Sequence, residues 1–291
     1  MQDKPKTTLN HAEMQGELKA PPSIQSPACC SRVLPGIVGS FIYYAMTPMK
    51  HHRIHHARID STNTHARALA TSGAEDGTIV TADFQTQGRG RLDRNWVSQP
   101  GVNLLVSCIL YPPRPMDEWG GIPLLAGLAV ADAVEHVSAC TAVLKWPNDV
   151  LVNNRKIAGV LVEAGQGAPR AWCVIGVGIN VNQRAFEGAY RLDPTSLLLA
   201  SGRMHDVEAV LDGFLSALDR WYAIWKAEGT ASIVRSWKQG SDVVGSVRDI
   251  EDGECVQRVT VLDVNEDGSL LVRHADDSQT RMYAGDLSVA I

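Results

Sequence analysis

Three arginines lie close together in the stretch QGRGRLDRNW, residues 87–96, with two glycines between them and a tryptophan at the end. They are Arg89, Arg91 and Arg94. Arginine resists burial and presents a rigid fork of donors that suits phosphate and carboxylate groups, and glycine lets the backbone approach a ligand closely. The stretch therefore predicts a mobile loop that closes on an anion. A solvated turn with scattered charge would explain the same residues, because short basic runs are common.

A second polar cluster lies in KWPNDVLVNNRKIAG, residues 145–159. Pro147 removes a backbone donor and breaks the strand, so we expect Asn148 and Asp149 at a turn, with side chains free to face a pocket. A tight turn at NNR would then return the chain and place Asp149 opposite Lys156 across a hairpin. The alternative is an ordinary hairpin with a surface ion pair worth under about 1 kcal/mol.

The third stretch is GVGIN, residues 176–180. It suggests a dinucleotide-binding loop, but Val181 stands where that fingerprint needs its third glycine, and the sequence has no Walker A loop. Any nucleotide must therefore be held in another way. Asn180 could donate to a phosphate or bind a metal, and the alternative is a strand end with a glycine turn.

Hydrophobic periodicity predicts the elements that position these residues. Helices are expected at 60–73, where Asp60 or Ser61 is the cap and Gly73 the end, at 122–137 from its apolar spacing, and at 206–229, where Gly229 is the end. Strands are expected in six apolar runs, at 78–85, 101–111, 142–146, 150–154, 156–164 and 172–182. After about Gly240 the chain changes to short strands of period two with turns such as NEDG, which predicts a small barrel.

Composition limits the class of protein. The 291 residues suffice for one large domain, or for one large and one small domain. The net charge of −5 argues against a general nucleic-acid binder. Cys108 and Cys173 lie in apolar runs and no CxxC pair occurs, which predicts buried free thiols in a reducing, cytoplasmic compartment. The sequence contains no run of 18 apolar residues, so it predicts no membrane span.

Residues 1–56 differ from the rest of the chain. They are polar, then rich in proline and serine, then briefly apolar, and we expect a poorly ordered extension. In HHRIHH, residues 51–56, histidines four residues apart could form a metal-binding face on a helix. No acidic or cysteine partner is nearby in sequence, so a strand or linker leading into IDSTN is the favoured interpretation.

Four motifs in this order and spacing resemble the catalytic core of biotin–protein ligases. They are DSTN from Asp60, QxxGRGRxxRxW from Gln85, KWPND…KxAG from Lys145 and GVGIN from Gly176. The resemblance covers roughly residues 57–291, and GRGR and KWPND are its specific parts. It implies an α+β catalytic domain at 57–239, with a mixed β-sheet and helices, and a small SH3-like carboxy-terminal β-barrel at 240–291. It also implies an ATP-dependent ligase that activates biotin as biotinyl-AMP and transfers it to a lysine of a biotin carboxyl carrier domain.

The resemblance also implies roles for single residues. The biotin carboxylate must attack the α-phosphate of ATP, and joining two anions requires cations and exact placement. The implied catalytic residues are Lys156, Asp149 and Arg89, with Asp149 orienting the incoming lysine or accepting its proton. The implied biotin contacts are Ser61, Thr62, Asn63, Gln85, Arg89, Gly90, Arg91 and Lys156. The implied ATP and adenylate contacts are Arg89, Arg91, Arg94, Trp96, Lys145, Asn148 and Asn180. Mg²⁺ is expected with the triphosphate, and its ligands are not identified.

Two alternatives use related machinery. A lipoate–protein ligase shares the fold and the chemistry, but the arginine loop and KWPND favour biotin. A non-catalytic biotin-sensing or DNA-binding regulator is disfavoured by the negative charge and by residues 1–56, which show no winged-helix pattern and contain prolines such as Pro21, Pro22, Pro27 and Pro35. We therefore expect a ligase without a repressor function, with no DNA or membrane partner, as a monomer or a weak homodimer that pairs through a sheet edge.

Overall fold

A seven-stranded mixed sheet is the main element of the computed structural model, which describes residues 49–92, 94–167, 170–252, 255–283 and 285–288. Its strand order is β1-β2-β3-β7-β6-β5-β4. β1 pairs with β2 in parallel, and the other neighbouring pairs are antiparallel. The strands are β1 His52–His56, β2 Thr78–Ala82, β3 Leu104–Leu110, β4 Val143–Lys145, β5 Asp149–Val152, β6 Arg155–Gly165 and β7 Trp172–Ile179. The mixed sheet of an α+β fold is therefore confirmed.

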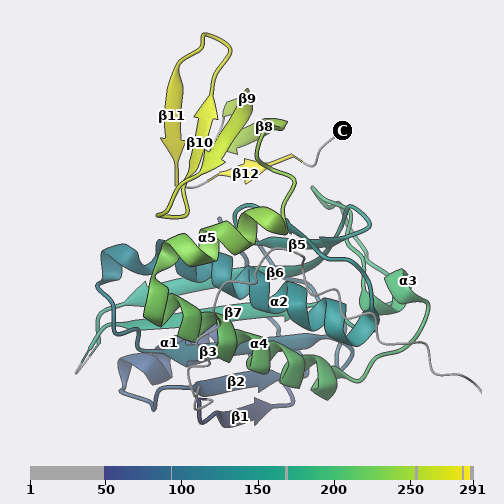
Figure 1. Ribbon diagram of the computed structural model, residues 1–291. Coiled ribbons are helices and arrows are strands. Elements are labelled where there is room, and N and C mark those ends of the chain that lie inside the picture. Colours follow the sequence, from purple (N-terminus) through teal and green to yellow (C-terminus); the bar gives the residue numbers. More distant parts are fainter. Residues whose placement is uncertain (1–48, 93, 168–169, 253–254, 284, 289–291) are drawn as a thin grey trace, which may run out of the picture. The chain divides into compact units, whose positions relative to one another are not determined.

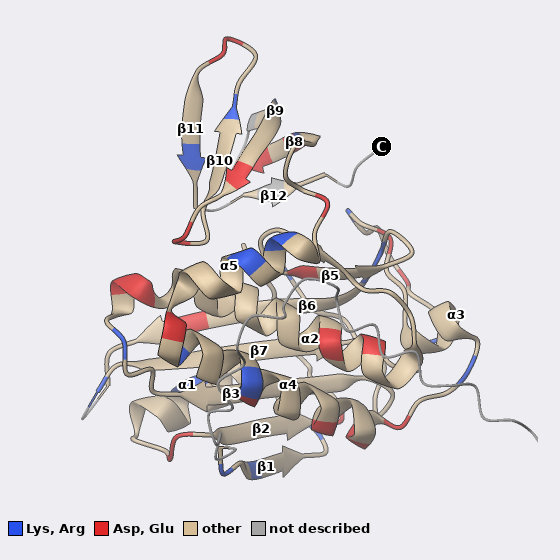
Figure 2. Ribbon diagram, in the orientation of Figure 1, with Lys and Arg blue, Asp and Glu red and all other residues tan. Residues whose placement is uncertain are grey.

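Different helices cover the two faces of this sheet (Figure 1). In β2, Ile79 packs with the cluster that contains α2, Ile122–Ser138, and α4, Val207–Glu228. The next residue, Val80, packs with the cluster that contains α1, Thr62–Thr71. Successive side chains of a strand point to opposite faces, so α1 lies on one face and α2 and α4 on the other. β3 and β7 carry no charged residue (Figure 2), as expected for strands covered on both sides.

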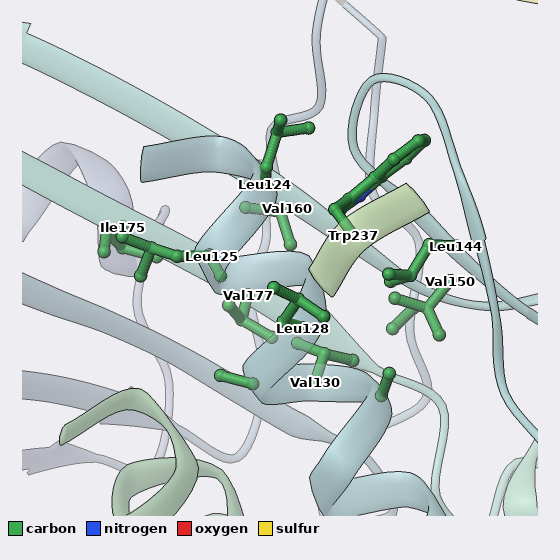
Figure 3. Close-up of a cluster of buried hydrophobic side chains, with 14 of the residues drawn as sticks. Leu124, Leu125, Leu128, Val130, Leu144, Val150, Val160, Ile175, Val177 and Trp237 are labelled. Carbon is green, nitrogen blue, oxygen red and sulfur yellow. The ribbon is translucent and has the colours of Figure 1, made fainter. Parts of the chain in front are cut away.

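The larger core lies between the sheet and α2, α4 and α5, Thr230–Gln239. Figure 3 shows side chains of α2 beside strand residues and Trp237 of α5; the labelled residues include Leu124, Leu125, Leu128, Val160, Ile175 and Val177. Among the described residues, one segment, Met116–Ser138, is long and apolar enough to cross a membrane, and 61% of an apolar 18-residue stretch within it is buried inside the protein. It consists of the short helix η1, Met116–Gly121, and α2. Its apolar side chains form this core.

The helix ends follow local sequence signals. Ser61, rather than Asp60, caps α1, and its side chain accepts from the backbone N–H of Thr64. The side chain of Asp206 caps α4 in the same way, and Gly229, with φ 79°, ends it. These ends confirm the two predicted boundaries.

Two α-helices were not predicted, α5 and the short α3, Leu197–Ser201. α5 starts directly after the glycine that stops α4, and only Ser232, Ile233, Val234 and Trp237 of its ten residues are buried. A helix of this length is marginal without tertiary packing. The packing that stabilises it comes from α2 and α4, and no local sequence signal reports that contact.

The carboxy-terminal segment forms a second, five-stranded antiparallel sheet in the order β11-β10-β9-β8-β12. Its strands are β8 Val247–Asp252, β9 Cys255–Val264, β10 Leu270–Arg273, β11 Gln279–Met282 and β12 Asp286–Leu287. The predicted NEDG turn joins β9 to β10; Gly268 adopts φ 84° there and donates its N–H to Asn265 O at 2.9 Å. The indole N–H of Trp146 donates to Gly268 O at 3.0 Å.

The large sheet begins earlier than the sequence predicted. Residues 52–56 were assigned to the amino-terminal extension, but they form the edge strand β1, in which His52 is aligned with Thr78 and His56 with Ala82. The sheet therefore begins at residue 52, and the favoured interpretation of HHRIHH as a strand, rather than a metal-binding helix, is confirmed for His52–His56. The rest of the predicted extension, residues 1–48, lies outside the described residues.

Candidate active site

One cavity of about 940 Å³ is lined by every site residue that the sequence predicted. The lining comes from the amino-terminal end of α1, the 85–97 segment, strands β4 to β7, the 186–194 segment and the small sheet. The predicted residues in it are Ser61, Thr62, Asn63, Gln85, Arg89, Gly90, Arg91, Arg94, Trp96, Lys145, Asn148, Asp149, Lys156 and Asn180. The tertiary fold thus brings together the four motifs that lie separately along the chain.

Buried polar side chains bond one another where α1 begins. Gln85 Oε1 accepts from the backbone N–H of Thr62 at 2.7 Å and from its hydroxyl at 2.9 Å. The Ser107 hydroxyl donates to Asn63 Oδ1 at 2.6 Å and lies 2.9 Å from Thr62 Oγ1. Groups that are buried and mutually satisfied hold one geometry, so this end of the cavity is polar and fixed. Ser107 was not predicted, because it lies inside the apolar run of β3.

The glycines of GVGIN are explained by side chains that approach β7. A Cβ on Gly176 would lie 1.8 Å from Asn63 Oδ1, and a Cβ on Gly178 would lie 2.5 Å from Cε2 of Trp96. Both glycines are inside the strand, so the interpretation as a glycine turn is wrong, and so is a phosphate loop of the dinucleotide type. Their function is to leave room for Asn63 and for the Trp96 indole.

The arginine loop is held by its own backbone. The Gly90 N–H donates to Arg94 O at 2.7 Å, and the Trp96 N–H donates to Gly88 O at 2.8 Å. A Cβ on Gly88 would lie 2.3 Å from Trp96 O, so only glycine allows this approach. The glycines therefore turn the loop so that Trp96 returns to the sheet.

Two lysines meet one carboxylate in the predicted hairpin. Lys156 Nζ lies 2.6 Å from Asp149 Oδ1, and Lys145 Nζ lies 3.8 Å from Asp149 Oδ2. The Asp149 side chain is 11% exposed, so this is not the exposed surface pair of the alternative interpretation. The turn between the strands places Asn153 and Asn154 at φ 53° and 60°, as in the favoured two-residue hairpin turn. Facing strands thus align three charges on the cavity wall.

Polar contacts also connect the loop to the hairpin. Arg91 Nη1 donates to Asn148 Oδ1 at 3.3 Å and to Gly285 O at 3.5 Å. Asn148 Nδ2 in turn donates to Val160 O at 2.7 Å. Asn180 Nδ2 donates to Thr195 O at 3.0 Å, whereas its buried Oδ1 has no partner among the described residues. An unpaired buried acceptor on a cavity wall is a position where a ligand donor fits.

Glu163 of β6 is a residue that the sequence reasoning missed. Arg89 Nη1 lies 3.1 Å from both of its carboxylate oxygens, and Arg67 Nη1 lies 3.0 Å from Oε1. Asn63 Nδ2 donates to Oε2 at 3.0 Å. The partners of Glu163 are at least 74 positions away in the chain, so no local motif could identify it.

The 186–194 segment was also missed, although it lines the cavity with Phe186 and Tyr190. The two rings contact each other edge to face, with centroids 6.3 Å apart. The only signal in the sequence was a pair of aromatic residues in a polar stretch. That signal is too weak to assign a site without the fold.

No group of three or more His, Cys, Asp or Glu side chains is placed to hold a metal ion in the part of the chain that the structure describes. Of the three carboxylate residues that line the cavity, Asp149, Glu187 and Asp249, the first is already paired with two lysines and the last with Arg258. The cluster HHRIHH likewise forms no metal site: His51 Nε2 lies 3.1 Å from Asp219, and His52 Nε2 lies 2.6 Å from Glu75. The described residues therefore do not fit a protein-built cage of oxygen ligands for Mg²⁺.

Comparison with known proteins agrees with this geometry. The model of the biotin/lipoate A/B protein ligase family matches residues 56–180. The chain is 32% identical over 244 residues to the bifunctional ligase/repressor BirA of Bacillus subtilis, covering 83% of this chain and 75% of that protein. It is 37% identical over 217 residues to the biotin–acetyl-CoA-carboxylase ligase of Mycobacterium tuberculosis, covering 67% of this chain and 79% of that protein.

Solved structures give the same result. The biotin protein ligase of Aquifex aeolicus in complex with biotin and ATP superposes with a TM-score of 0.69 at 28% identity, covering 81% of this chain and 97% of that one. The chain therefore belongs to the biotin/lipoate A/B protein ligase family, among its biotin protein ligases. The resemblance inferred from the four motifs is confirmed.

Proposed function

We propose that this protein is an ATP-dependent biotin–protein ligase, which activates biotin as biotinyl-AMP and transfers the biotinyl group to a lysine of a biotin carboxyl carrier domain. The observation that carries the proposal is the single cavity lined by all the predicted residues. Its relatives are named as biotin ligases, and the Aquifex structure holds biotin and ATP. These names favour biotin over lipoate and an enzyme over a non-catalytic regulator.

The reaction has two steps that balance separately. In the first, a carboxylate oxygen of biotin forms a bond to the α-phosphorus of ATP while the bond to the pyrophosphate oxygen breaks, and pyrophosphate leaves. In the second, the lysine nitrogen of the carrier forms a bond to the activated carbonyl carbon, AMP leaves and the amine loses a proton. Both steps develop negative charge on oxygen, which nearby cations stabilise.

The fixed polar end of the cavity is the proposed site of the biotin ring. Ser61, Thr62, Asn63 and Gln85 are the polar groups there, and Gly90 allows the loop backbone to come close. Biotin is a small apolar ring system with one polar head, and sites for such ligands combine apolar walls with a few placed polar groups.

The two lysines and the arginine loop are the proposed charge-stabilising groups. Lys156 and Lys145 approach the same carboxylate, so Asp149 holds their ammonium groups in place. In this proposal Lys156 stabilises the reacting carboxylate and phosphate, and Lys145 contacts the nucleotide phosphates. Asp149 then orients the incoming lysine of the carrier or accepts its proton in the second step.

The remaining predicted residues are proposed to hold the adenylate. Arg91 is positioned by its bond to Asn148, and Asn180 offers a buried acceptor. Arg94 and Trp96 close the loop over the bound intermediate. Mg²⁺ would enter with the triphosphate, and we assign it no ligand and no step because the described residues form no cage for it.

A further set of proposals concerns the whole chain. We propose that residues 57–239, extended by β1, form the catalytic domain. The proposed second domain is an SH3-like barrel at 240–291, supported by the five antiparallel strands. A cytoplasmic protein with a biotin carboxyl carrier domain as its partner fits the relatives named as acetyl-CoA-carboxylase ligases. We propose a monomer or a weak homodimer that pairs through a sheet edge, such as that of β1, the end strand of the described sheet.

Two substitutions test the proposed chemistry. Lys156→Ala should reduce adenylate formation, measured by pyrophosphate exchange, by about 30- to 1,000-fold, since a lost charge contact in such a site is worth roughly 2–4 kcal/mol. Asp149→Asn should slow transfer from pre-formed biotinyl-AMP to the carrier more than it slows the exchange. Lys238 and Asp263 form a matched control pair outside the cavity, with Nζ and Oδ1 2.5 Å apart.

The outcomes separate the proposal from its alternatives. If Lys156→Ala and Asp149→Asn change only the melting temperature, as the control variants Lys238→Ala and Asp263→Asn are expected to do, the cavity pair has a structural role and the proposal fails. Labelled lipoate in place of labelled biotin tests the lipoate alternative. Label transfer from lipoate, and not from biotin, would overturn the choice of substrate.

A further inference from the structure

The carboxylate of Glu163 is the meeting point of three segments. Arg89 reaches it from the arginine loop, with Nη1 3.1 Å from each oxygen. Arg67 and Asn63 reach it from α1, each at 3.0 Å. The Glu163 side chain is 18% exposed, whereas those of Arg89 and Arg67 are 39% and 45% exposed. The carboxylate is thus less exposed than either arginine that pairs with it.

Glu163 does not line the cavity itself, although Leu161 of the same strand does. The hydrogen bonds of the Arg89 guanidinium are therefore made to a group outside the cavity wall. Within the described residues, Arg89 forms an ion pair with Glu163. Arg91 instead bonds Asn148, and Lys156 lies beside Asp149, both of which are cavity residues.

We propose that Glu163 is a positioning residue that fastens the arginine loop over the cavity by its ion pair with Arg89. In this inference, which rests on the proposed function, the Arg89 guanidinium holds the loop closed, and the cations that act on the substrates are those of Arg91 and Lys156. This replaces the direct catalytic role that the resemblance implied for Arg89.

The second contact of Glu163 extends its effect to the biotin ring site. Asn63 donates to Glu163 through Nδ2 and accepts from Ser107 through Oδ1. Rotation of the Asn63 amide would break both bonds, and the Oδ1 atom is already confined by Gly176. The Glu163 carboxylate therefore fixes both the Asn63 amide, which borders the ring site, and Arg89, which holds the loop closed. Loop closure and ring binding are consequently expected to be coupled through Glu163.

A double-mutant cycle tests this inference in the full-length protein. The variants are Glu163→Gln, which keeps the shape and removes the charge, Arg89→Ala and the double variant. The release rate of pre-formed biotinyl-AMP should rise by about 3- to 20-fold in each single variant, because a partly exposed charge-assisted pair is lost. The double variant should release the adenylate no faster than the faster single variant, because both changes break the same contact. Arg89→Lys should restore part of the effect.

Arg67→Ala is the matched control, because Arg67 shares the carboxylate but does not belong to the loop. It should leave the release rate near that of the wild type. An equal increase in Arg67→Ala would mean that Glu163 only supports α1, and it would overturn the inference. Additive effects of Glu163→Gln and Arg89→Ala would also overturn it, because Arg89 would then act on the ligand directly.

Hydrogen exchange in the absence of substrates separates this inference from the proposed function. Glu163→Gln and Arg89→Ala should each lose amide protection in residues 88–96, and Arg67→Ala should not. Unchanged protection in the first two variants would refute the role of Glu163 whatever the protein catalyses. Conversely, a wild-type protein that forms no biotinyl-AMP would refute the proposed function, while the exchange measurement would still report on the loop.

Discussion

Substitution of Gly178 by alanine is the sharpest test of how the arginine loop closes. A Cβ at this position would lie 2.5 Å from Cε2 of Trp96 and 2.7 Å from its Cζ2 and Nε1 atoms. Such distances are well inside van der Waals contact, so either β7 or the indole must move. β7 is hydrogen-bonded on both sides, to β3 and β6, whereas Trp96 belongs to a loop. We therefore expect the indole to be displaced and the strand to stay in place.

The size of the effect follows from the cost of overpacking. Inserting a methyl group into a filled site typically costs about 1–3 kcal/mol. Because the loop absorbs the movement, this cost falls on loop closure rather than on the folded state as a whole. At about 1.4 kcal/mol per factor of ten, it corresponds to a roughly 5- to 150-fold shorter lifetime of the bound adenylate. The displaced Trp96 ring would also move away from Lys156, whose Nζ lies 5.7 Å from the ring centre.

The assay is the release of labelled biotinyl-AMP, followed with the melting temperature for each variant. Gly127→Ala is the matched control: its Cβ would meet Leu144 Cδ2 at an ordinary 3.5 Å, and in the interior of α2 alanine is favoured over glycine by roughly 0.5–1 kcal/mol. In a Trp96→Ala background, Gly178→Ala should add nothing. A normal adenylate lifetime in Gly178→Ala, or a further loss in that background, would refute the reasoning.

Three more predictions concern single groups. Arg91→Ala should let biotinyl-AMP leak into solution more than it weakens biotin binding, because its contact to phosphate exists only after the first step; an unchanged adenylate lifetime would contradict this. The hydrogen bond to Asp219 raises the pKa of His51 above its ordinary value of 6.5. The bond therefore stabilises the folded state fully below pH 6.5, and this stabilisation is lost as the pH rises through the pKa of His51 in the folded protein. His51→Gln should therefore lower the free energy of unfolding more at pH 5.5 than at pH 9, and an equal loss at both would refute it. Burial raises the pKa of Cys173 to about 12 and that of Cys108 as well, so peptide mapping should find both alkylated by iodoacetamide only after unfolding, and rapid native labelling would contradict their burial.

Much of the site was readable along the chain because its signals are local. Ser61 caps α1 through its own side chain, and Asn153 and Asn154 make the turn that sets Asp149 opposite Lys156. A cap and a two-residue turn depend on residues a few positions apart. The order and spacing of the four motifs were then enough to predict the family, the α+β class and fourteen of the residues that line the cavity.

The tertiary structure decided the features that depend on residues far apart in the sequence. Gly176 and Gly178 lie in a strand that the sequence predicted, but only the fold shows that their missing side chains admit Asn63 and Trp96. Glu163 looks like one exposed polar residue in an alternating strand, yet it collects partners from two other segments. Strand order is the physical reason: β6 and β7 are neighbours in the sheet, and α1 packs across β7, so contacts spanning about a hundred positions form only once the sheet is assembled. Sequence periodicity reports which face of a strand is buried, but it does not report which side chain from another segment will cover that face.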